Sequence, residues 1–515
     1  MSANKGNGER IAKNTIALYF RMIFTMAVGL FTSRVILDAL GIENYGIYNL
    51  VGGFIAMFNI FRAGLVAATQ RFITYDLGKG NVKEVQRTFS NCMIIFLMVS
   101  AVIVVVAEIF GIWFIENKLT IPADRMYAAH WAFQFSLFTL ILNVISFPYS
   151  ALIIAHERMK AFAYISIVEV VAKLLVAYAI YVSPFDKLIV YAFLLCFVQF
   201  VIRMIYNAYC IRNFPESKIE WIIDSKKIKK IYSFTGWELF GSVSVLAYTQ
   251  GLNILLGMFF SPVINAARGV AVHVQSAITG FVTNFQTALN PQITKNYAMG
   301  NVDYMFKLVF ISSRTSYYLL FLFALPLMLE ADILLNLWLV EVPDYTVIFF
   351  RLIIITTMID AISNPIITTV EATGNIRLYQ VVVGGLLLMI LPVSYISLKL
   401  GGAPYSVFIV HILFASLAFG ARLIMARRAT GLPIYLFFNS VMLRVFVVTL
   451  LSAAIPFALH IFLKEGIVRL FIVVPLSVII SVFVIYTIGL QSQERNMIKE
   501  KVVSKFPNIR KNDKD

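Results

Sequence analysis

The amino-acid sequence predicts an all-α polytopic membrane protein. Fourteen transmembrane helices are expected, arranged as two six-helix lobes in a parallel repeat and followed by two more helices. Of its 515 residues, 60% are apolar and only 14% are charged, and the mean hydropathy is +0.83. Such a composition is typical of a chain that crosses a membrane many times. Apolar segments of about 17–28 residues recur along the chain, and each is long enough to cross ~30 Å of hydrocarbon.

The predicted spans follow one another with short connections. The first two form a hairpin around the turn at residues 41–44. The apolar run of the first span is full length and follows a polar, basic start, which favours a retained helix over a cleaved signal peptide. The fourteen spans are expected at residues 16–40, 45–70, 89–114, 127–153, 161–182, 188–210, 233–259, 263–289, 305–329, 347–370, 378–398, 404–426, 438–462 and 468–489.

Loop charges predict the orientation. Lys and Arg collect in alternate loops, for example Lys83 and Arg87, then Arg158 and Lys160, while the loop at 330–344 is acidic. Cytoplasmic loops carry an excess of Lys and Arg. Both termini are therefore expected on the cytoplasmic side of the membrane, and the net charge of +16 reflects topology rather than nucleic-acid binding.

Two short motifs recur with nearly the same separation. The sequence GNV at 80–82 occurs again at 300–302. The sequence ISFP at 145–148 is matched by ISNP at 362–365. Because each lobe has six helices, both lobes begin on the same side of the membrane, which defines a parallel repeat about the membrane normal. The predicted domains are an N-lobe at 1–210, a basic cytoplasmic linker at 211–232, a C-lobe at 233–428, two added helices at 429–490 and a basic cytoplasmic tail at 491–515.

Several arginines fall inside the predicted spans. Arg21 lies ~10 Å from the cytoplasmic start of the first span, and Arg62 lies at a comparable depth in the second. Arg34 is near the outer end of the first span, and Arg268 is ~9 Å from the outer end of the eighth. Because charges within a membrane usually face a bundle interior or a watery cavity, we predict that these four residues line a cationic cavity between the lobes. A guanidinium binds phosphate oxygens bidentately, so the cargo would carry phosphate.

Structural interpretations remain open for these residues. Arg34 and Asp38 are four residues apart on one helix face and could neutralise each other. The same spacing favours a structural role for the pair Glu169 and Lys173 over a catalytic one. Glu238 and Asp360 are candidates for binding a coupling proton or Na⁺.

The motifs of catalysis are missing from the sequence. Residues 78–81 (GKGN) lack the glycine spacing and the Ser or Thr of a P-loop, and the five histidines lack metal-ligand spacing. We therefore expect no enzyme activity, no metal and no cofactor. A gradient of H⁺ or Na⁺, or the membrane potential, would drive the protein.

Diffuse motifs over essentially the whole chain carry a family resemblance. They are residues 14–15 (NT), 34–50 (RVILDALGIENYGIYNL), 265–271 (NAARGVA) and 291–293 (PQI). With the six-plus-six-plus-two arrangement, the chain resembles the polysaccharide transporter (Wzx-type flippase) branch of the multidrug/oligosaccharidyl-lipid/polysaccharide (MOP) exporter superfamily.

The resemblance implies a MATE-like V-shaped fold and a cargo of undecaprenyl-pyrophosphate-linked oligosaccharide, used for O-antigen, lipopolysaccharide or capsule synthesis. It also implies that Arg21, Arg34, Arg62 and Arg268 correspond to the cationic cavity of related lipid II flippases. The polysaccharide polymerase and glycosyltransferases of the same pathway are candidate partners.

Three alternatives compete with this interpretation. A lipid II-type flippase would have a similar charge distribution. A cation-coupled multidrug exporter of the same fold would favour an acidic, aromatic cavity. A membrane-embedded glycosyltransferase or polymerase would have a large outer loop or a catalytic carboxylate pair, whereas the outer loops here are short.

Overall fold

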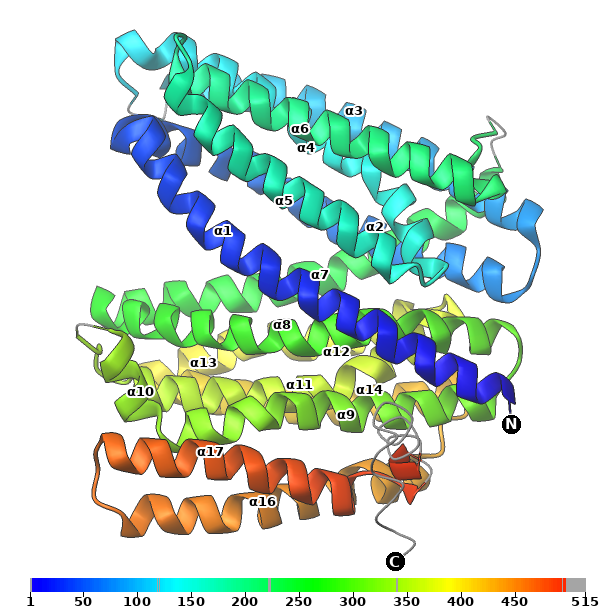
Figure 1. Ribbon diagram of the computed structural model, residues 1–515, viewed down its shortest axis with the longest axis vertical. Coiled ribbons are helices and arrows are strands. Elements are labelled where there is room, and N and C mark those ends of the chain that lie inside the picture. Colours follow the sequence, from blue (N-terminus) through cyan, green and yellow to red (C-terminus); the bar gives the residue numbers. More distant parts are fainter. Residues whose placement is uncertain are drawn as a thin grey trace, which may run out of the picture. The chain divides into compact units, whose positions relative to one another are not determined.

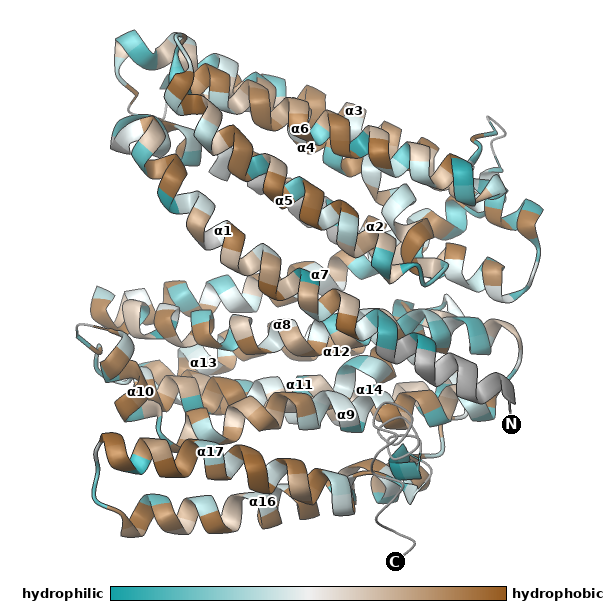
Figure 2. Cartoon of the chain, viewed as in Figure 1, coloured by the Kyte–Doolittle hydropathy of each residue, from teal (hydrophilic) through white to brown (hydrophobic). Residues whose placement is uncertain are grey.

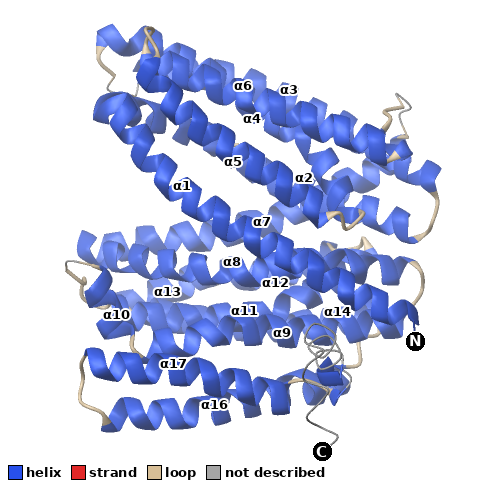
Figure 3. Ribbon diagram, viewed as in Figure 1, coloured by secondary structure: helices blue, strands red, loops and turns tan. Residues whose placement is uncertain are grey.

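The computed structural model describes residues 2–117, 119, 121–220, 224–339, 341–492 and 494–496, and within these residues all regular structure is helical (Figure 3). The part of the predicted basic tail from residue 497 onward lies outside the described residues. The α-helices are α1 (Ser2–Ala56), α2 (Asn59–Gly78), α3 (Val82–Asn117), α4 (Met126–Ala155), α5 (Met159–Val182), α6 (Lys187–Asn213), α7 (Ser225–Phe259), α8 (Pro262–Ala298), α9 (Val302–Leu329), α10 (Ala331–Trp338), α11 (Thr346–Thr373), α12 (Arg377–Leu388), α13 (Ile390–Lys399), α14 (Ser406–Thr430), α15 (Ile434–Phe437), α16 (Leu443–Phe462) and α17 (Ile467–Val484). Short 3₁₀ turns η1 (Ala123–Arg125) and η2 (Pro215–Ser217) and π-helical turns at Phe438–Met442 and Ile485–Gly489 complete the described elements.

Twelve helical stretches among the described residues are long and apolar enough to cross a membrane, so the chain is a multi-pass membrane protein. The predicted spans at 45–70 and 263–289 are not among the twelve. The second of them lies within α8, which is 37 residues long but rich in Asn, Gln and Thr. Helix α8 is therefore long enough to cross a membrane, but its polar residues lower its mean hydropathy. The count of fourteen stays a prediction.

The predicted hairpin turn is present as a kink at Gly41. This residue has φ +78° and ψ 162°, a conformation that glycine adopts far more readily than other residues. Helical structure resumes at once and continues to Ala56, and α2 begins at Asn59. The sequence did not predict the break at residues 57–58, where the backbone N–H groups of Met57 and Phe58 donate to carbonyls three residues back.

Matching helix ends support the internal repeat. Gly80 and Gly300, the first residues of the two GNV motifs, both adopt the left-handed conformation, with φ of 72° and 75°. Glu157 and Gly374, which follow the ISFP and ISNP motifs at equal distance along the chain, do the same, with φ of 58° and 80°. A left-handed residue just after a helix is a common way to end it. The repeated motifs therefore correspond to repeated backbone conformations.

The chain forms two compact units. The first comprises Met1–Ala247, Asn284–Met305 and Thr368–Gly385, and the second comprises Tyr248–Thr283, Phe306–Ile367 and Leu386–Asp515. Each is described by itself below. The domain boundaries expected from the sequence stay a prediction.

In the first unit, α1 packs against α5 and α4 packs against α6. Small and aromatic side chains fill the core, such as Ala177 on α5, and Phe89, whose ring centroid lies 5.2 Å from that of Tyr149. Small residues let apolar helices approach closely, which favours packing in a membrane, where lipid tails are as apolar as leucine.

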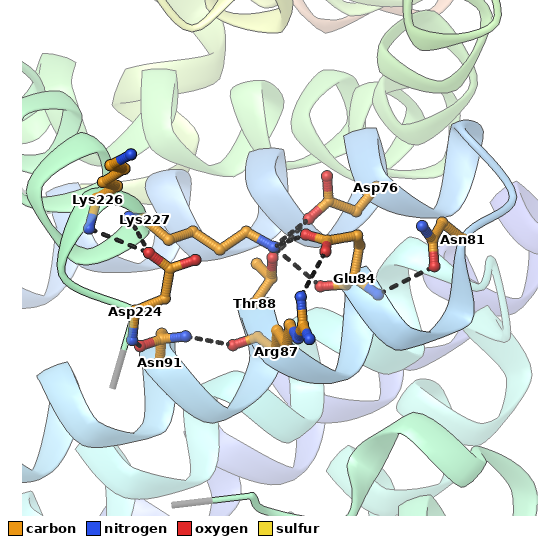
Figure 4. Close-up of polar contacts among 9 residues, drawn as sticks. All are labelled: Asp76, Asn81, Glu84, Arg87, Thr88, Asn91, Asp224, Lys226 and Lys227. Carbon is orange, nitrogen blue, oxygen red and sulfur yellow. Dashed lines mark hydrogen bonds and ion pairs between the residues drawn. The ribbon is translucent and has the colours of Figure 1, made fainter. Parts of the chain in front are cut away.

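Ion pairs connect the start of α7 to the end of α2 and the start of α3 (Figure 4). The ammonium of Lys227 lies 2.7 Å from a carboxylate oxygen of Glu84 and 3.3 Å from one of Asp76. Asp224 accepts hydrogen bonds from the backbone N–H groups of Lys226 and Lys227. The basic segment predicted as a linker therefore contacts acidic side chains of its own unit.

In the second unit, α16 and α17 lie side by side (Figure 1). Ion pairs link these helices to the rest of the unit. Arg469 on α17 pairs with buried Glu330 at 3.1 Å, and Glu494 pairs with Arg314 of α9 at 2.6 Å. The side chain of Arg314 is fully buried, so this charge inside a predicted span is a structural partner of Glu494.

Hydrophobic residues make up much of the helices, and hydrophilic residues are more frequent toward the helix ends and loops (Figure 2). Phe471 and Phe483 on α17, for example, are 73% and 66% exposed. Such surface is expected where helices face lipid.

Candidate functional site

A cavity of about 540 Å³ lies within the first unit. We call it the arginine cavity, because Arg21 of α1 and Arg62 of α2 both line it. Its remaining lining is mostly polar or aromatic, and consists of Tyr48, Gly52, Ile55, Ser136, Thr139, Leu140, Asn143, Ser146, Phe147, Ser150, Phe162, Ser166, Glu169, Lys173, Gln199 and Tyr206.

Aromatic rings support both guanidinium groups. The guanidinium carbon of Arg62 lies 4.1 Å from the ring centroid of Phe147, and that of Arg21 lies 4.9 Å from that of Phe162. Such cation–π contacts stabilise a cation in a partly desolvated place. They also leave the edge of each guanidinium, where its N–H donors lie, open to other partners.

The two arginines differ in their hydrogen bonds. Arg21 donates from Nη2 to the side-chain oxygen of Asn284, 2.9 Å away, while its Nε is buried without a partner. Arg62 is exposed and makes no side-chain hydrogen bond or ion pair within the described part of the chain. Both keep donors that an anionic group could use.

A polar stripe runs along α4 on the cavity side. Ser136, Thr139, Asn143, Ser146 and Ser150 are spaced by three or four residues, which places them on one helix face. The hydroxyls of Thr139 and Ser146 donate to carbonyls four residues back, so their lone pairs remain available as acceptors. These residues were not predicted from the sequence, although their spacing was a readable signal.

Helix α5 adds an ion pair to the same wall. Lys173 and Glu169 lie 2.6 Å apart, one helical turn from each other. This confirms the pairing that the sequence predicted. With Arg21 and Arg62, the cavity has three cationic side chains and one carboxylate, so its lining has a net positive charge.

Arg34 and Asp38 do not line the arginine cavity. Both are exposed on α1, and Asp38 accepts a hydrogen bond from the Tyr181 hydroxyl at 2.5 Å. No ion pair joins Arg34 to Asp38 in the described part of the chain, and a role for either residue stays a prediction.

Arg268 and Asp360 belong to the second unit. Arg268 is buried and bonds to α7 through the side-chain oxygen of Asn253 and the carbonyl of Thr249. Asp360 pairs with Arg422 of α14 at 3.2 Å. These contacts join helices within that unit, and a role for Arg268 in the cargo cavity stays a prediction.

Glu238 of α7 lies in the first unit and accepts a hydrogen bond from Gln380 of α12 at 2.7 Å. Together with Asp360 it remains a candidate for coupling. In the part of the chain that the structure describes, no three His, Cys, Asp or Glu side chains form a group that could hold a metal ion.

Comparison with known proteins identifies relatives. Residues 11–297, more than half of the chain, match the family described as "Polysaccharide biosynthesis protein". The chain matches no curated protein.

Solved structures share the fold. A multidrug resistance MATE family transporter of the MOP superfamily, in an outward-facing conformation, superposes with a TM-score of 0.67 at 14% identity, over 82% of this chain and 97% of that one. The Vibrio cholerae MATE transporter VcmN gives a TM-score of 0.65 at 15% identity, over 86% of this chain and 100% of that one. The MATE transporter ClbM, in complex with Rb⁺, gives a TM-score of 0.64 at 15% identity, over 84% of this chain and 97% of that one. At these identities the likeness shows the fold alone, which is that of MATE transporters.

Proposed function

Because this chain belongs to the polysaccharide biosynthesis protein family, we propose that it is a flippase. Its cargo would be an undecaprenyl-pyrophosphate-linked oligosaccharide, carried from the cytoplasmic to the outer face of the inner membrane for O-antigen or capsule synthesis. One observation carries the proposal: a single cavity brings together two arginines and a row of hydroxyl and amide side chains. The arginines can bind phosphate, and the hydroxyl and amide side chains can bind sugar.

The two arginines would hold the pyrophosphate. Charge-assisted hydrogen bonds from a guanidinium to phosphate are about twice as strong as neutral ones. Arg62 has no competing side-chain hydrogen bond in the described residues, and Phe147 holds the plane of its guanidinium. The hydroxyls along α4 and the amide of Gln199 would bind the glycan while the polyprenyl chain stays in lipid.

The cargo would cross by alternating access, with no covalent bond formed or broken by the protein. An inside-negative potential favours outward movement of an anion by ~2.3 kcal/mol per charge per 100 mV. A gradient of protons or Na⁺ would add to this driving force if the ion binds at Glu238 or Asp360. Both termini would lie in the cytoplasm, and the polymerase and glycosyltransferases of the pathway would supply and consume the cargo.

The charge of the cavity separates this proposal from a multidrug exporter of the same fold. An exporter of organic cations would favour an acidic as well as aromatic cavity, because like charges repel. Here Arg21, Arg62 and Lys173 outnumber Glu169. A lipid II-type flippase fits the same charge and is the remaining alternative.

The test is reconstitution in liposomes with a labelled pyrophosphate-linked oligosaccharide. Arg21→Ala and Arg62→Ala should each lower the initial flipping rate about tenfold or more, since a hydrogen bond to a charged group contributes about 1.5–3 kcal/mol. Arg427→Gln, an exposed change on α14, is the matched control and should flip normally. Normal rates in both cavity variants would reject the proposal, and faster flipping of lipid II would favour the alternative.

A further inference from the structure

A second cavity, of about 610 Å³, lies in the first unit where the turn between α4 and α5 meets the beginning of α1. We call it the terminal cavity. It is lined by Arg10, Lys13, Asn14, His156, Glu157, Arg158, Met159, Lys160, Ala161 and Tyr209. None of these residues lines the arginine cavity. The flippase proposal does not use them.

Four of these ten residues are Lys or Arg, and only one is a carboxylate. That carboxylate, Glu157, already has partners of its own. It pairs with Arg10 at 2.9 Å and with Lys295 at 2.8 Å, and it accepts a hydrogen bond from Gln292 at 2.6 Å. Its charge is therefore balanced without Arg158 or Lys160.

Arg158 and Lys160 are both exposed, and neither side chain forms a hydrogen bond or ion pair within the described part of the chain. Other cations of the first unit do find carboxylates, as Lys227 finds Glu84 and Asp76 (Figure 4). A general excess of loop cations explains the number of positive charges. It does not explain why two cations without a partner, Arg158 and Lys160, share a cavity with the polar side chains of Asn14 and Tyr209.

The surroundings of the terminal cavity point to a lipid. Apolar helix α4 ends at Ala155 and α5 begins at Met159, so the cavity lies at an end of two membrane spans, where lipid phosphates are found. Helices α1 and α5, which both contribute to its lining, expose large apolar residues further along, including Phe20 at 61% and Tyr164 at 67%. Such side chains suit contact with acyl chains.

We propose that the terminal cavity binds the phosphate of an anionic phospholipid headgroup from the surrounding leaflet, held chiefly by Arg158 and Lys160. Basic clusters next to membrane spans are attracted to anionic lipids in this way. The proposal does not depend on the identity of the transported cargo.

The test uses the full-length protein in detergent, titrated separately with short-chain phosphatidylglycerol, short-chain phosphatidylcholine and inorganic phosphate. The shift in unfolding temperature and the apparent affinity are measured. Phosphatidylglycerol should stabilise the wild type, while the other two should have little effect. The double variant Arg158→Gln/Lys160→Gln should bind phosphatidylglycerol about tenfold more weakly, since each cation near an anionic lipid surface contributes several-fold in affinity.

The matched control is Arg427→Gln/Arg428→Gln, which removes the same charge from an exposed position on α14. It should bind like the wild type. Equal binding by the cavity variant and the wild type would overturn the proposal, as would equal stabilisation by phosphatidylcholine. Stabilisation by inorganic phosphate alone would also overturn it and assign the cavity to a soluble anion. If the double variant unfolds, Lys160→Gln alone provides the same comparison.

Discussion

The carboxylate of Glu157 lies 2.8 Å from the ammonium of Lys295, so the turn after α4 is tied to the end of α8 within the first unit. The Glu157 side chain is fully buried although its backbone has a φ of 58°. At the matching position of the repeat, the left-handed residue is Gly374. Glycine adopts this conformation without steric cost. We infer that glutamate is retained at 157 for its ion pairs.

The first prediction compares two variants of Glu157. Glu157→Gln should lower the free energy of unfolding by about 2–4 kcal/mol, because removing one partner leaves a poorly hydrated charge on Lys295. Glu157→Gly removes the same ion pairs but relieves backbone strain worth about 1–2 kcal/mol. It should be less stable than wild type yet more stable than the glutamine variant, as measured by thermal unfolding in detergent.

Glu341→Gln, at an exposed residue of the loop after α10, serves as the control and should leave the unfolding temperature unchanged. A glycine variant more stable than wild type would mean that the ion pairs of Glu157 contribute less than its strain.

The second prediction concerns Asp186, at the start of α6. Its carboxylate accepts hydrogen bonds from the backbone N–H groups of Leu188 and Ile189, and it pairs with Arg125 at 2.7 Å. Asparagine can keep the cap but not the charge. Asp186→Asn should therefore cost about 0.5 kcal/mol. Asp186→Ala should cost about 1 kcal/mol more, because the cap is lost as well. Equal unfolding temperatures for the two variants would exclude a contribution from the cap.

Much of the fold could be predicted from the sequence, because apolar length is a local property. The span predicted at 89–114 lies within α3, for example, and the span predicted at 468–489 covers nearly all of α17 and the π-helical turn that follows it. The break at residues 57–58 and the short helix α10 were not predicted. Both depend on local backbone conformation within or beside apolar sequence, where hydrophobic periodicity gives little signal.

The candidate site was predicted in part. Arg21 and Arg62 could be identified because a charge within apolar sequence is conspicuous, and the structure places both on one cavity. Ser136 and Asn143 were missed because small polar residues are common in membrane helices. The partner of Arg268 could not be predicted either, since Asn253 comes from another helix and their contact depends on how α7 packs against α8.

The third prediction concerns acid stability through Glu216. Burial raises the pKa of this carboxyl and is the largest single effect. The hydrogen bond with His156, a backbone hydrogen bond and the charge interaction with His156 together outweigh burial, so the net pKa lies below the ordinary 4.5. A depressed folded-state pKa stabilises the protein above the unfolded value, and this contribution is lost as pH falls through the folded value. The stability advantage of wild type over Glu216→Gln should thus be present at neutral pH and shrink below about pH 4.5.

Unfolding temperatures of both proteins across pH 3–7 would check this. A difference that stays constant to the lowest pH would show that the Glu216 carboxylate is not the group responsible.

The last prediction tests whether Arg62 acts through its shape as well as its charge. Lysine keeps the positive charge but lacks the planar fork that binds two phosphate oxygens and stacks on an aromatic ring. In the liposome assay, Arg62→Lys should flip the pyrophosphate-linked glycan about threefold more slowly than wild type, and Arg62→Ala about tenfold or more, in line with hydrogen bonds to charged groups. Phe147→Leu removes the ring that lies 4.1 Å from the guanidinium carbon and should match the lysine variant. If lysine restores the full rate, charge alone suffices at this position. If the alanine variant flips normally, Arg62 has no part in holding the cargo.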